Sequence, residues 1–309
     1  MQRNWFNYLI ISLKGLAMGA ADVVPGVSGG TIAFISGIYE ELIDSIKSVN
    51  LPNLKLLLKG DFKGFWQAVN GNFLLSLVAG IGLSILSLAK LLKYILENNP
   101  VLLWSFFFGL VVASAITVAG NIPKWDWKKV LALIFGTAIA YLITSMTPAE
   151  TTDASWFLFL CGAIAICAMI LPGVSGAFIL LMFGKYQFFI TALTNIEIKP
   201  ILLLMSGAGI GIMMFSRLLS WLLHRFHDIT IAILAGFMIG SLNKIWPWKQ
   251  VLETYIDRHG EVKPLFEPNV LPTTYESVTG EPAQIVYAAL LAVAGFLLIW
   301  IMEKATSKK

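Results

Sequence analysis

Long apolar segments set the strongest limit on how this chain of 309 residues can fold. A helix needs roughly 20 apolar residues to cross the hydrocarbon core of a bilayer. Only 13% of the residues are charged, against about 25% in a typical soluble domain, and the shortfall is concentrated in these segments. Six segments reach the length of a span: 71–97, 101–120, 128–146, 199–224, 228–246 and 283–302. The sequence therefore predicts an all-α polytopic membrane protein with a single membrane domain.

Four further apolar segments form two pairs, at 5–46 and 155–196, and each pair is interrupted by glycine and proline. The interruptions are nearly identical, because PGVSGG at 25–30 returns as PGVSGA at 172–177, 147 positions later. A second stretch repeats at a separation of 127 and matches Gly80 with Gly207, Gly82 with Gly209, Lys90 with Arg217, Gly109 with Gly236 and Ser114 with Ser241. Two aligned blocks in the same order indicate an internal duplication. We expect a first repeat at 1–146 and a second at 155–302, each a broken or re-entrant helix hairpin followed by three transmembrane helices.

The distribution of charge between the loops predicts how the repeats are oriented. Three crossings per repeat would turn the second repeat over relative to the first, which gives inverted-topology repeats. Basic residues gather at both termini and in loops 47–70 and 121–130, whereas loops 147–154 and 247–282 are richer in acidic residues. The positive-inside rule therefore predicts that the N- and C-termini are cytoplasmic. The net charge of +4 lies in loops, which indicates topology rather than nucleic-acid binding.

The repeated proline–glycine segment predicts a binding site inside the membrane. Lipid cannot satisfy free backbone N–H and C=O groups, so non-helical backbone at membrane depth must face protein or a water-filled cavity. Proline ends the first helix, glycine permits tight backbone, and the next helix turns free N–H groups and the positive end of its dipole into the break. We expect the two breaks to meet near the midplane and to bind an anion such as a phosphate through Pro25, Gly26, Ser28, Gly29, Gly30, Thr31, Pro172, Gly173, Ser175 and Gly176. Two alternatives stay open: the segment is only a turn, and each serine only caps the following helix.

Three charged residues inside apolar segments extend the predicted site. Lys90 and Arg217 occupy matched positions, and they either hold an anionic headgroup from two sides or snorkel to the membrane interface. Asp22 precedes the first break, where a carboxylate is expensive, and it either couples transport to a proton or caps exposed N–H groups. Cys161 and Cys167 lie six residues apart in one apolar segment, a spacing that indicates packing rather than a metal site or a disulfide. No cofactor is expected.

The run GAADVVPGVSGGT at 19–31, together with LPGVSG at 171–176, resembles the bacterial polyprenyl-phosphate transporter family, the PopT-like undecaprenyl-phosphate translocases. The resemblance covers nearly the whole chain. It implies a transporter, not an enzyme, that returns undecaprenyl phosphate from the outer to the inner leaflet of the bacterial plasma membrane, with coupling to a proton or a sodium ion as an expectation. The polyprenyl tail can stay in lipid if the passage opens sideways, and one half rocking against the other would give alternating access.

Two rival functions follow from the same residues. Membrane phosphatases of the undecaprenyl-pyrophosphate type have a similar Pro-Gly-x-Ser break, but there an arginine follows the serine, and here Gly29 and Gly176 follow it. A phosphoryl-transfer site also needs concentrated cationic or metal stabilisation, which the sequence does not show. A channel or transporter for a small soluble anion would use the same helix ends as a lipid carrier.

Overall fold

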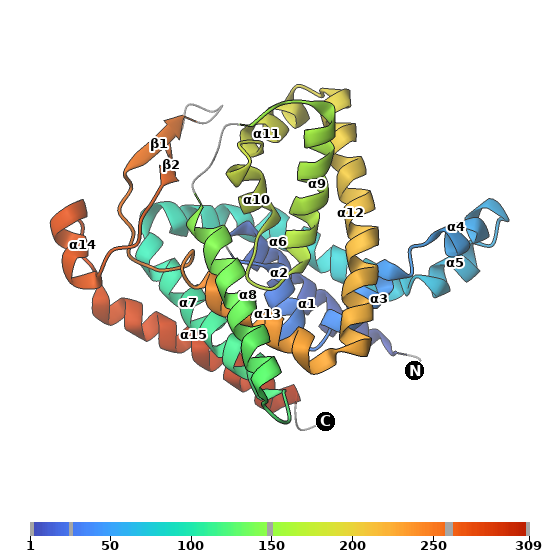
Figure 1. Ribbon diagram of the computed structural model, residues 1–309, viewed down its shortest axis with the longest axis horizontal. Helices are drawn as coiled ribbons and strands as arrows, with labels where there is room; N and C mark the ends of the chain where they lie inside the picture. Colours follow the sequence, from blue (N-terminus) through green and yellow to red (C-terminus); the bar gives the residue numbers. More distant parts are fainter. Residues whose placement is uncertain (1–2, 25–26, 147–150, 257–261, 307–309) are drawn as a thin grey trace.

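The computed structural model describes residues 3–24, 27–146, 151–256 and 262–306, which form a helical body (Figure 1). The first predicted repeat contains eight helices: α1 Trp5–Val23, α2 Gly29–Ile35, α3 Tyr39–Lys47, α4 Leu51–Leu58, α5 Phe62–Ala68, α6 Gly71–Asn98, α7 Pro100–Gly120 and α8 Trp127–Ser145. The second contains α9 Ser155–Ile170, α10 Gly176–Met182, α11 Tyr186–Thr194, α12 Ile198–Arg225, α13 His227–Ser241, β1 Glu253–Ile256, β2 Val262–Phe266, α14 Pro272–Thr279 and α15 Ile285–Thr306.

Five helices of the described chain are long and apolar enough to cross a membrane: α6, α7, α8, α12 and α15. The bent pair of α10 and α11, with 106° between its helices, makes a sixth if it is counted as one span. These helices confirm the prediction of an all-α, multi-pass membrane protein. The predicted span 228–246 is too long, because α13 ends at Ser241 and the chain then turns and buries Ile245.

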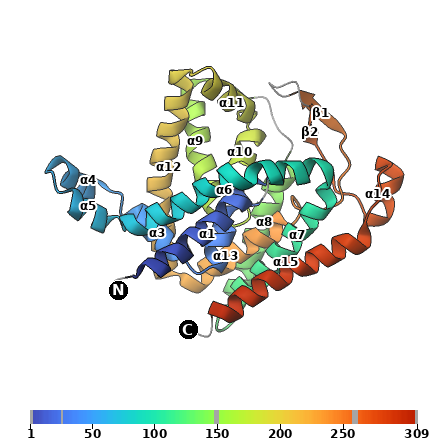
Figure 2. The ribbon, with the colours of Figure 1, turned by 180° about the vertical axis from the view of Figure 1, so that it is seen from behind.

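The helices of the two repeats pair in the same way. Helix α1 packs along α6 as α9 packs along α12, and α7 packs along α15 as α13 packs along α8 (Figures 1 and 2). Because α7 matches α13 in sequence and α8 and α15 are the last helices of their repeats, each repeat pairs its last helix with the other repeat. This pairing fits the duplication, while the opposite orientation of the two repeats in the membrane stays a prediction.

Matched glycines allow these helix pairs to approach closely. A Cβ atom on Gly80 would lie 2.0 Å from a carbonyl oxygen of α1, and one on Gly207 would lie 1.9 Å from a carbonyl oxygen of α9. A Cβ atom on Gly109 would lie 1.8 Å from a carbonyl oxygen of α15, and one on Gly236 would lie 2.2 Å from a carbonyl oxygen of α8. Small residues at such positions bring membrane helices into backbone contact, so any side chain there would push each pair apart.

Each hairpin contains a second bend that the sequence analysis did not predict. Gly37 and Gly184 adopt left-handed backbone, with φ angles of 71° and 63°. In both repeats the glycine N–H and the next N–H donate hydrogen bonds to carbonyls of the preceding helix. For the second of these N–H groups the bonds are Ile38 N to Ala33 O (3.0 Å) and Lys185 N to Leu180 O (2.8 Å). This is the glycine-ended helix cap known as the Schellman motif. Each predicted pair of segments is therefore three helices.

The two long loops of the sequence analysis also contain regular structure. Residues 47–70 hold α4 and α5, which project from the body next to α3 and the start of α6 (Figures 1 and 2). Residues 247–282 hold the antiparallel strands β1 and β2 and helix α14, at the opposite end of the molecule (Figure 1). Helix α2, which follows the first break, contacts α9, which precedes the second break.

Candidate functional site

The residues that follow the first proline–glycine pair are in direct contact with the second break. The Ser28 hydroxyl donates to Leu171 O (3.0 Å), and the Gly173 N–H donates to Thr31 Oγ1 (3.0 Å). The Tyr39 hydroxyl, from α3, lies 3.2 Å from the carbonyl oxygen at the end of α9. Polar groups of one repeat therefore satisfy backbone groups of the other, as backbone at membrane depth requires.

The first break is closed by its own side chains. The Gly29 N–H donates to Asp22 Oδ1 (2.7 Å), and the Gly30 N–H donates to Ser28 Oγ (3.1 Å). Asp22 thereby joins the end of α1 to the start of α2, which is the capping role proposed for it from the sequence, and Ser28 caps α2 as the alternative reading expected. The predicted site residues Pro25 and Gly26 lie outside the described residues.

The glycines of the first break fit closely against their neighbours. A Cβ atom on Gly29 would lie 2.5 Å from the Asp22 carboxylate, and one on Gly30 would lie 2.4 Å from Ile170 O. Thr31 is 0% exposed and Ser28 is 1% exposed. The first break is therefore buried against the end of α9 in this arrangement.

The second break differs from the first in how its serine is paired. Gly173 adopts left-handed backbone with a φ angle of 89°, and a Cβ atom there would lie 2.6 Å from Ser241 Oγ of α13. Ser175 precedes α10 but its side chain makes no capping hydrogen bond, and its hydroxyl has no hydrogen-bond partner among the described residues. Ser175 is 8% exposed, and Pro172 and Gly176 are buried beside it. The second break thus carries an unpaired serine hydroxyl in the described chain, whereas the serine of the first break is paired.

The two predicted cations lie on exposed helix faces. Lys90 on α6 and Arg217 on α12 are both exposed, and Arg217 Nη1 donates to Met213 O of its own helix (2.8 Å). Within the described chain no hydrogen bond or ion pair joins either residue to the breaks. Their role in holding a headgroup stays a prediction.

Lys244 is a cation close to α10 that was not predicted from the sequence. Its Nζ lies 5.0 Å from the centre of the Phe178 ring, on the α10 helix that begins just after Ser175. Its carbonyl accepts a hydrogen bond from Lys249 Nζ (2.5 Å), which lies 5.3 Å from the centre of the Trp104 ring. A lysine inside the predicted span 228–246 was the signal that could have found it.

Lys249 lies in the connection after α13, outside the spans. Its pKa is lowered to about 7, first by burial and then by the nearby Lys244, against an opposing effect of Glu267. It lines a cavity of about 380 Å³ together with Glu267, Tyr275 and residues of neighbouring loops. This cavity therefore combines a lysine with the carboxylates of Glu267 and Glu281.

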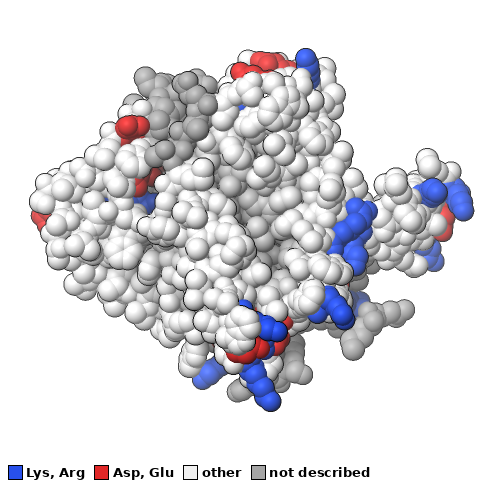
Figure 3. Space-filling model, in the orientation of Figure 1, with Lys and Arg blue, Asp and Glu red and all other residues white. Residues whose placement is uncertain are grey.

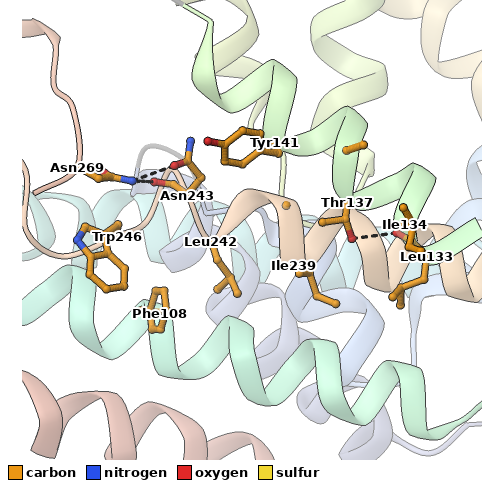
Figure 4. A pocket seen from close by; sticks show the side chains of 12 residues that line it. Phe108, Leu133, Ile134, Thr137, Tyr141, Ile239, Leu242, Asn243, Trp246 and Asn269 are labelled. Atoms are coloured by element: carbon orange, nitrogen blue, oxygen red, sulfur yellow. Dashed lines mark hydrogen bonds between the residues drawn. The ribbon is translucent and has the colours of Figure 1, made fainter. Parts of the chain in front are cut away.

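An apolar groove lies between α7, α8 and α13 (Figure 4), and α13 also contacts the second break, where Ser241 lies against Gly173. The groove has a volume of about 700 Å³, and apolar side chains such as Phe108 and Leu133 line it. One end is polar, because Asn269 Nδ2 donates to the Asn243 backbone and side-chain oxygens (2.8 and 2.9 Å), close to Tyr141 (Figure 4). A long hydrocarbon chain could lie along such a groove with its polar end at the asparagines.

Comparison with known proteins assigns this architecture to a family. Residues 18–263, which include both breaks, match the undecaprenyl phosphate translocase-like family. The chain belongs to the undecaprenyl phosphate translocase-like family. It is 44% identical over 302 residues to a polyprenyl-phosphate transporter of Vibrio cholerae, covering 98% of each chain. It is 33% identical over 264 residues to a polyprenyl-phosphate transporter of Staphylococcus aureus, covering 80% of this chain and 87% of the relative.

Membership of the undecaprenyl phosphate translocase-like family confirms the resemblance drawn from the repeated break. No solved structure matches the chain. The contacts between the two repeats at the breaks are the structural basis for a mechanism.

Proposed function

We propose that this protein moves undecaprenyl phosphate across the plasma membrane and returns it to the cytoplasmic leaflet by alternating access. The observation that carries the proposal is the contact of the two breaks, in which Thr31 and Ser28 of one repeat bond to the backbone of the other. Family membership and the names of the two relatives support the substrate class. In this proposal the protein is a carrier and makes or breaks no covalent bond.

The phosphate headgroup would replace the contacts between the breaks. Phosphate oxygens accept hydrogen bonds, and the breaks offer the Gly173 N–H and the hydroxyls of Ser28, Thr31 and Ser175. Hydrogen bonds to an anion are stronger than those to a neutral carbonyl. The headgroup could therefore separate the repeats on one side while keeping the buried donors satisfied.

The arrangement of the surrounding helices supports a passage that opens sideways. The apolar groove between α7, α8 and α13 would give the polyprenyl tail a path along a helix that contacts the second break (Figure 4). Lys90 and Arg217 would attract the headgroup from the two leaflets. The start of α1 and the end of α15 lie at the same edge of the molecule in both views, which supports the proposal that both termini are cytoplasmic (Figures 1 and 2).

Asp22 is the proposed coupling residue. Its carboxylate holds the Gly29 N–H (2.7 Å) at the start of α2, so a proton or a sodium ion bound there would weaken this contact. Binding of the ion would then bias the first break toward opening, as linkage between an ion and a two-state element requires. Asp22→Asn would keep the hydrogen-bond acceptor and remove dependence on the ion gradient.

A leaflet assay of undecaprenyl phosphate in proteoliposomes tests this proposal. Ser28→Ala is expected to slow translocation about 10- to 150-fold, since a hydrogen bond to a charged group contributes roughly 1.5–3 kcal/mol. Ser87→Ala is the matched control, because Ser87 bonds only to the Leu83 carbonyl of its own helix, at 2.6 Å, on the exposed face of α6. Arg217→Ala is likewise expected to slow transport, with the exposed Arg225→Ala as its control.

The same preparation separates the rival functions. Wild-type rates in both Ser28→Ala and Arg217→Ala would remove the site assignment. Phosphate released from a polyprenyl pyrophosphate by the purified protein would identify a phosphatase instead. Uptake of a labelled small anion without movement of the lipid would identify a soluble-anion transporter.

A further inference from the structure

We propose that helices α4 and α5 form an amphipathic hairpin that lies on the bilayer surface and binds anionic lipid headgroups. The two helices pack on each other, and α5 packs on the start of α6. Neither helix contains a buried residue, and both views show the hairpin projecting from the helical body (Figures 1 and 2). This hairpin plays no part in the proposed contacts between the breaks, so the inference stands independently of the transport proposal.

Trp66 fixes the hairpin at the level where a membrane span begins. Its Nε1 donates to Asn72 Oδ1 (2.8 Å), in the first turn of α6. Its ring covers Gly71, where a Cβ atom would lie 2.4 Å from a ring carbon. Gly71 is the first residue of the candidate span Gly71–Leu88. Because α5 ends at Ala68, the hairpin is joined to the membrane-spanning helix by a two-residue link and must lie near the interface, where tryptophan is favoured.

The side chains of the hairpin suit a lipid surface. Leu51, Leu58 and Phe62 are 74%, 88% and 69% exposed, which is costly in water and favourable at the boundary of headgroups and acyl chains. Lys55, Lys59 and Lys63 are also exposed, and Figure 3 shows basic side chains over the projection. Long lysine side chains can lay their apolar stems along the hydrocarbon boundary and extend the ammonium to the headgroups.

The charge of the hairpin favours anionic lipid over a second copy of the chain. The hairpin contains three lysines and a single acidic residue, Asp61. The Asp61 carboxylate accepts the Gly64 N–H (2.8 Å) as a helix cap. Two such hairpins in contact would bring like charges together, which opposes association. A leaflet rich in anionic headgroups attracts basic segments next to a span. The equivalent connection of the second repeat, 195–197, joins α11 to α12 directly, so the feature belongs to one repeat only.

A depth measurement tests the proposal on the full chain. Cys161 and Cys167 are replaced by alanine, one cysteine is introduced as Leu58→Cys, and an environment-sensitive nitrobenzoxadiazole dye is attached. The protein is reconstituted in vesicles of phosphatidylcholine alone or with phosphatidylglycerol, with brominated lipids as quenchers. We expect a blue-shifted emission and strong quenching by bromines about 5–10 Å below the headgroups, and both effects should be larger with phosphatidylglycerol. The control label is Glu276→Cys, on the exposed face of α14, which should show neither effect.

A charge variant separates the electrostatic and apolar contributions. Lys55→Gln, Lys59→Gln and Lys63→Gln together should abolish the difference between the two vesicle types, and size-exclusion profiles verify that the exposed substitutions leave the fold intact. A label at position 58 that is as unquenched as the label at 276 would overturn the proposal. A blue shift without lipid quenching would place another protein chain on the hairpin, and a shift that grows with the ratio of protein to lipid would identify that chain as a second copy.

Discussion

Replacing Gly30 by alanine tests how closely the two repeats must approach at the breaks. The added Cβ atom would lie 2.4 Å from Ile170 O and 3.1 Å from the carbonyl carbon of the same residue. Ordinary contacts between such atoms need about 3.5 Å, so α2 and the end of α9 must separate by about 1 Å. The opposing group is backbone and cannot rotate away. Overpacking of this kind costs about 1–3 kcal/mol.

The matched control is Gly82→Ala in α6, where an added Cβ atom meets no heavy atom within 4 Å. That substitution should stabilise the helix by up to about 1 kcal/mol through its propensity alone. Thermal unfolding in detergent, followed by loss of the monodisperse size-exclusion peak, measures both variants against wild type. We expect a lower midpoint for Gly30→Ala and an equal or higher one for Gly82→Ala. Equal midpoints in the two variants would show that the breaks do not pack against each other in the protein.

Three further substitutions test separate contacts. Thr31→Val leaves the buried Gly173 N–H without its acceptor and should destabilise the protein by about 1–3 kcal/mol, whereas Thr31→Ser keeps the hydroxyl and should retain most of the wild-type thermal midpoint. Gly207→Ala would place a Cβ atom 1.9 Å from a carbonyl oxygen of α9, so it should lower the midpoint, while Gly209→Ala, two residues along the same helix and in open space, should not. Because burial lowers the pKa of Lys249 to about 7 and the unfolded chain holds this proton up to about pH 10.4, stability should fall as the pH drops from about 10 to 7 and level off below. Lys249→Met should remove that slope in pH-dependent unfolding, and an unchanged slope would contradict the assignment.

The sequence predicted the centre of the molecule better than its periphery. Two copies of PGVSG in apolar surroundings indicated that non-helical backbone from both repeats would meet. Ser28 does bond to Leu171 of the second repeat, and Gly173 bonds to Thr31 of the first. The matched glycines also have the same role in both repeats, because a neighbouring helix packs closely against Gly80 and against Gly207. These features repeat, and repetition separates them from chance patterns.

The bends at Gly37 and Gly184 show where the apolar pattern failed. A single glycine inside a helix costs only about 1 kcal/mol, so an apolar run of 17 residues at 30–46 is equally compatible with one helix. At each glycine the left-handed conformation lets the next N–H, of Ile38 or Lys185, donate to a carbonyl of the preceding helix. Tertiary packing decides whether this bend forms. The match between the two glycines was visible in the sequence, but its structural meaning was not.

Lys244 was missed for a different reason, and the reason bears on mechanism. Residues 228–246 are apolar enough to predict one span, and this prediction gives Lys244, near the end of the segment, no role of its own. The chain leaves the helix at Ser241, whose hydroxyl lies against Gly173, and this early exit returns Lys244 toward Phe178 at the start of α10. A full-length helix would have carried the ammonium toward the membrane surface. The short helix instead places the Lys244 ammonium near Phe178 of α10, the helix that follows Ser175, so the two repeats differ in charge as well as in capping. A headgroup passing between the repeats would have to displace a backbone carbonyl before it could bind a donor of the first break, such as the Ser28 hydroxyl. The Ser175 hydroxyl of the second break has no partner within the described chain to displace. In the proposed mechanism the second break would therefore form the earlier contact, and the first break would be the one that opens.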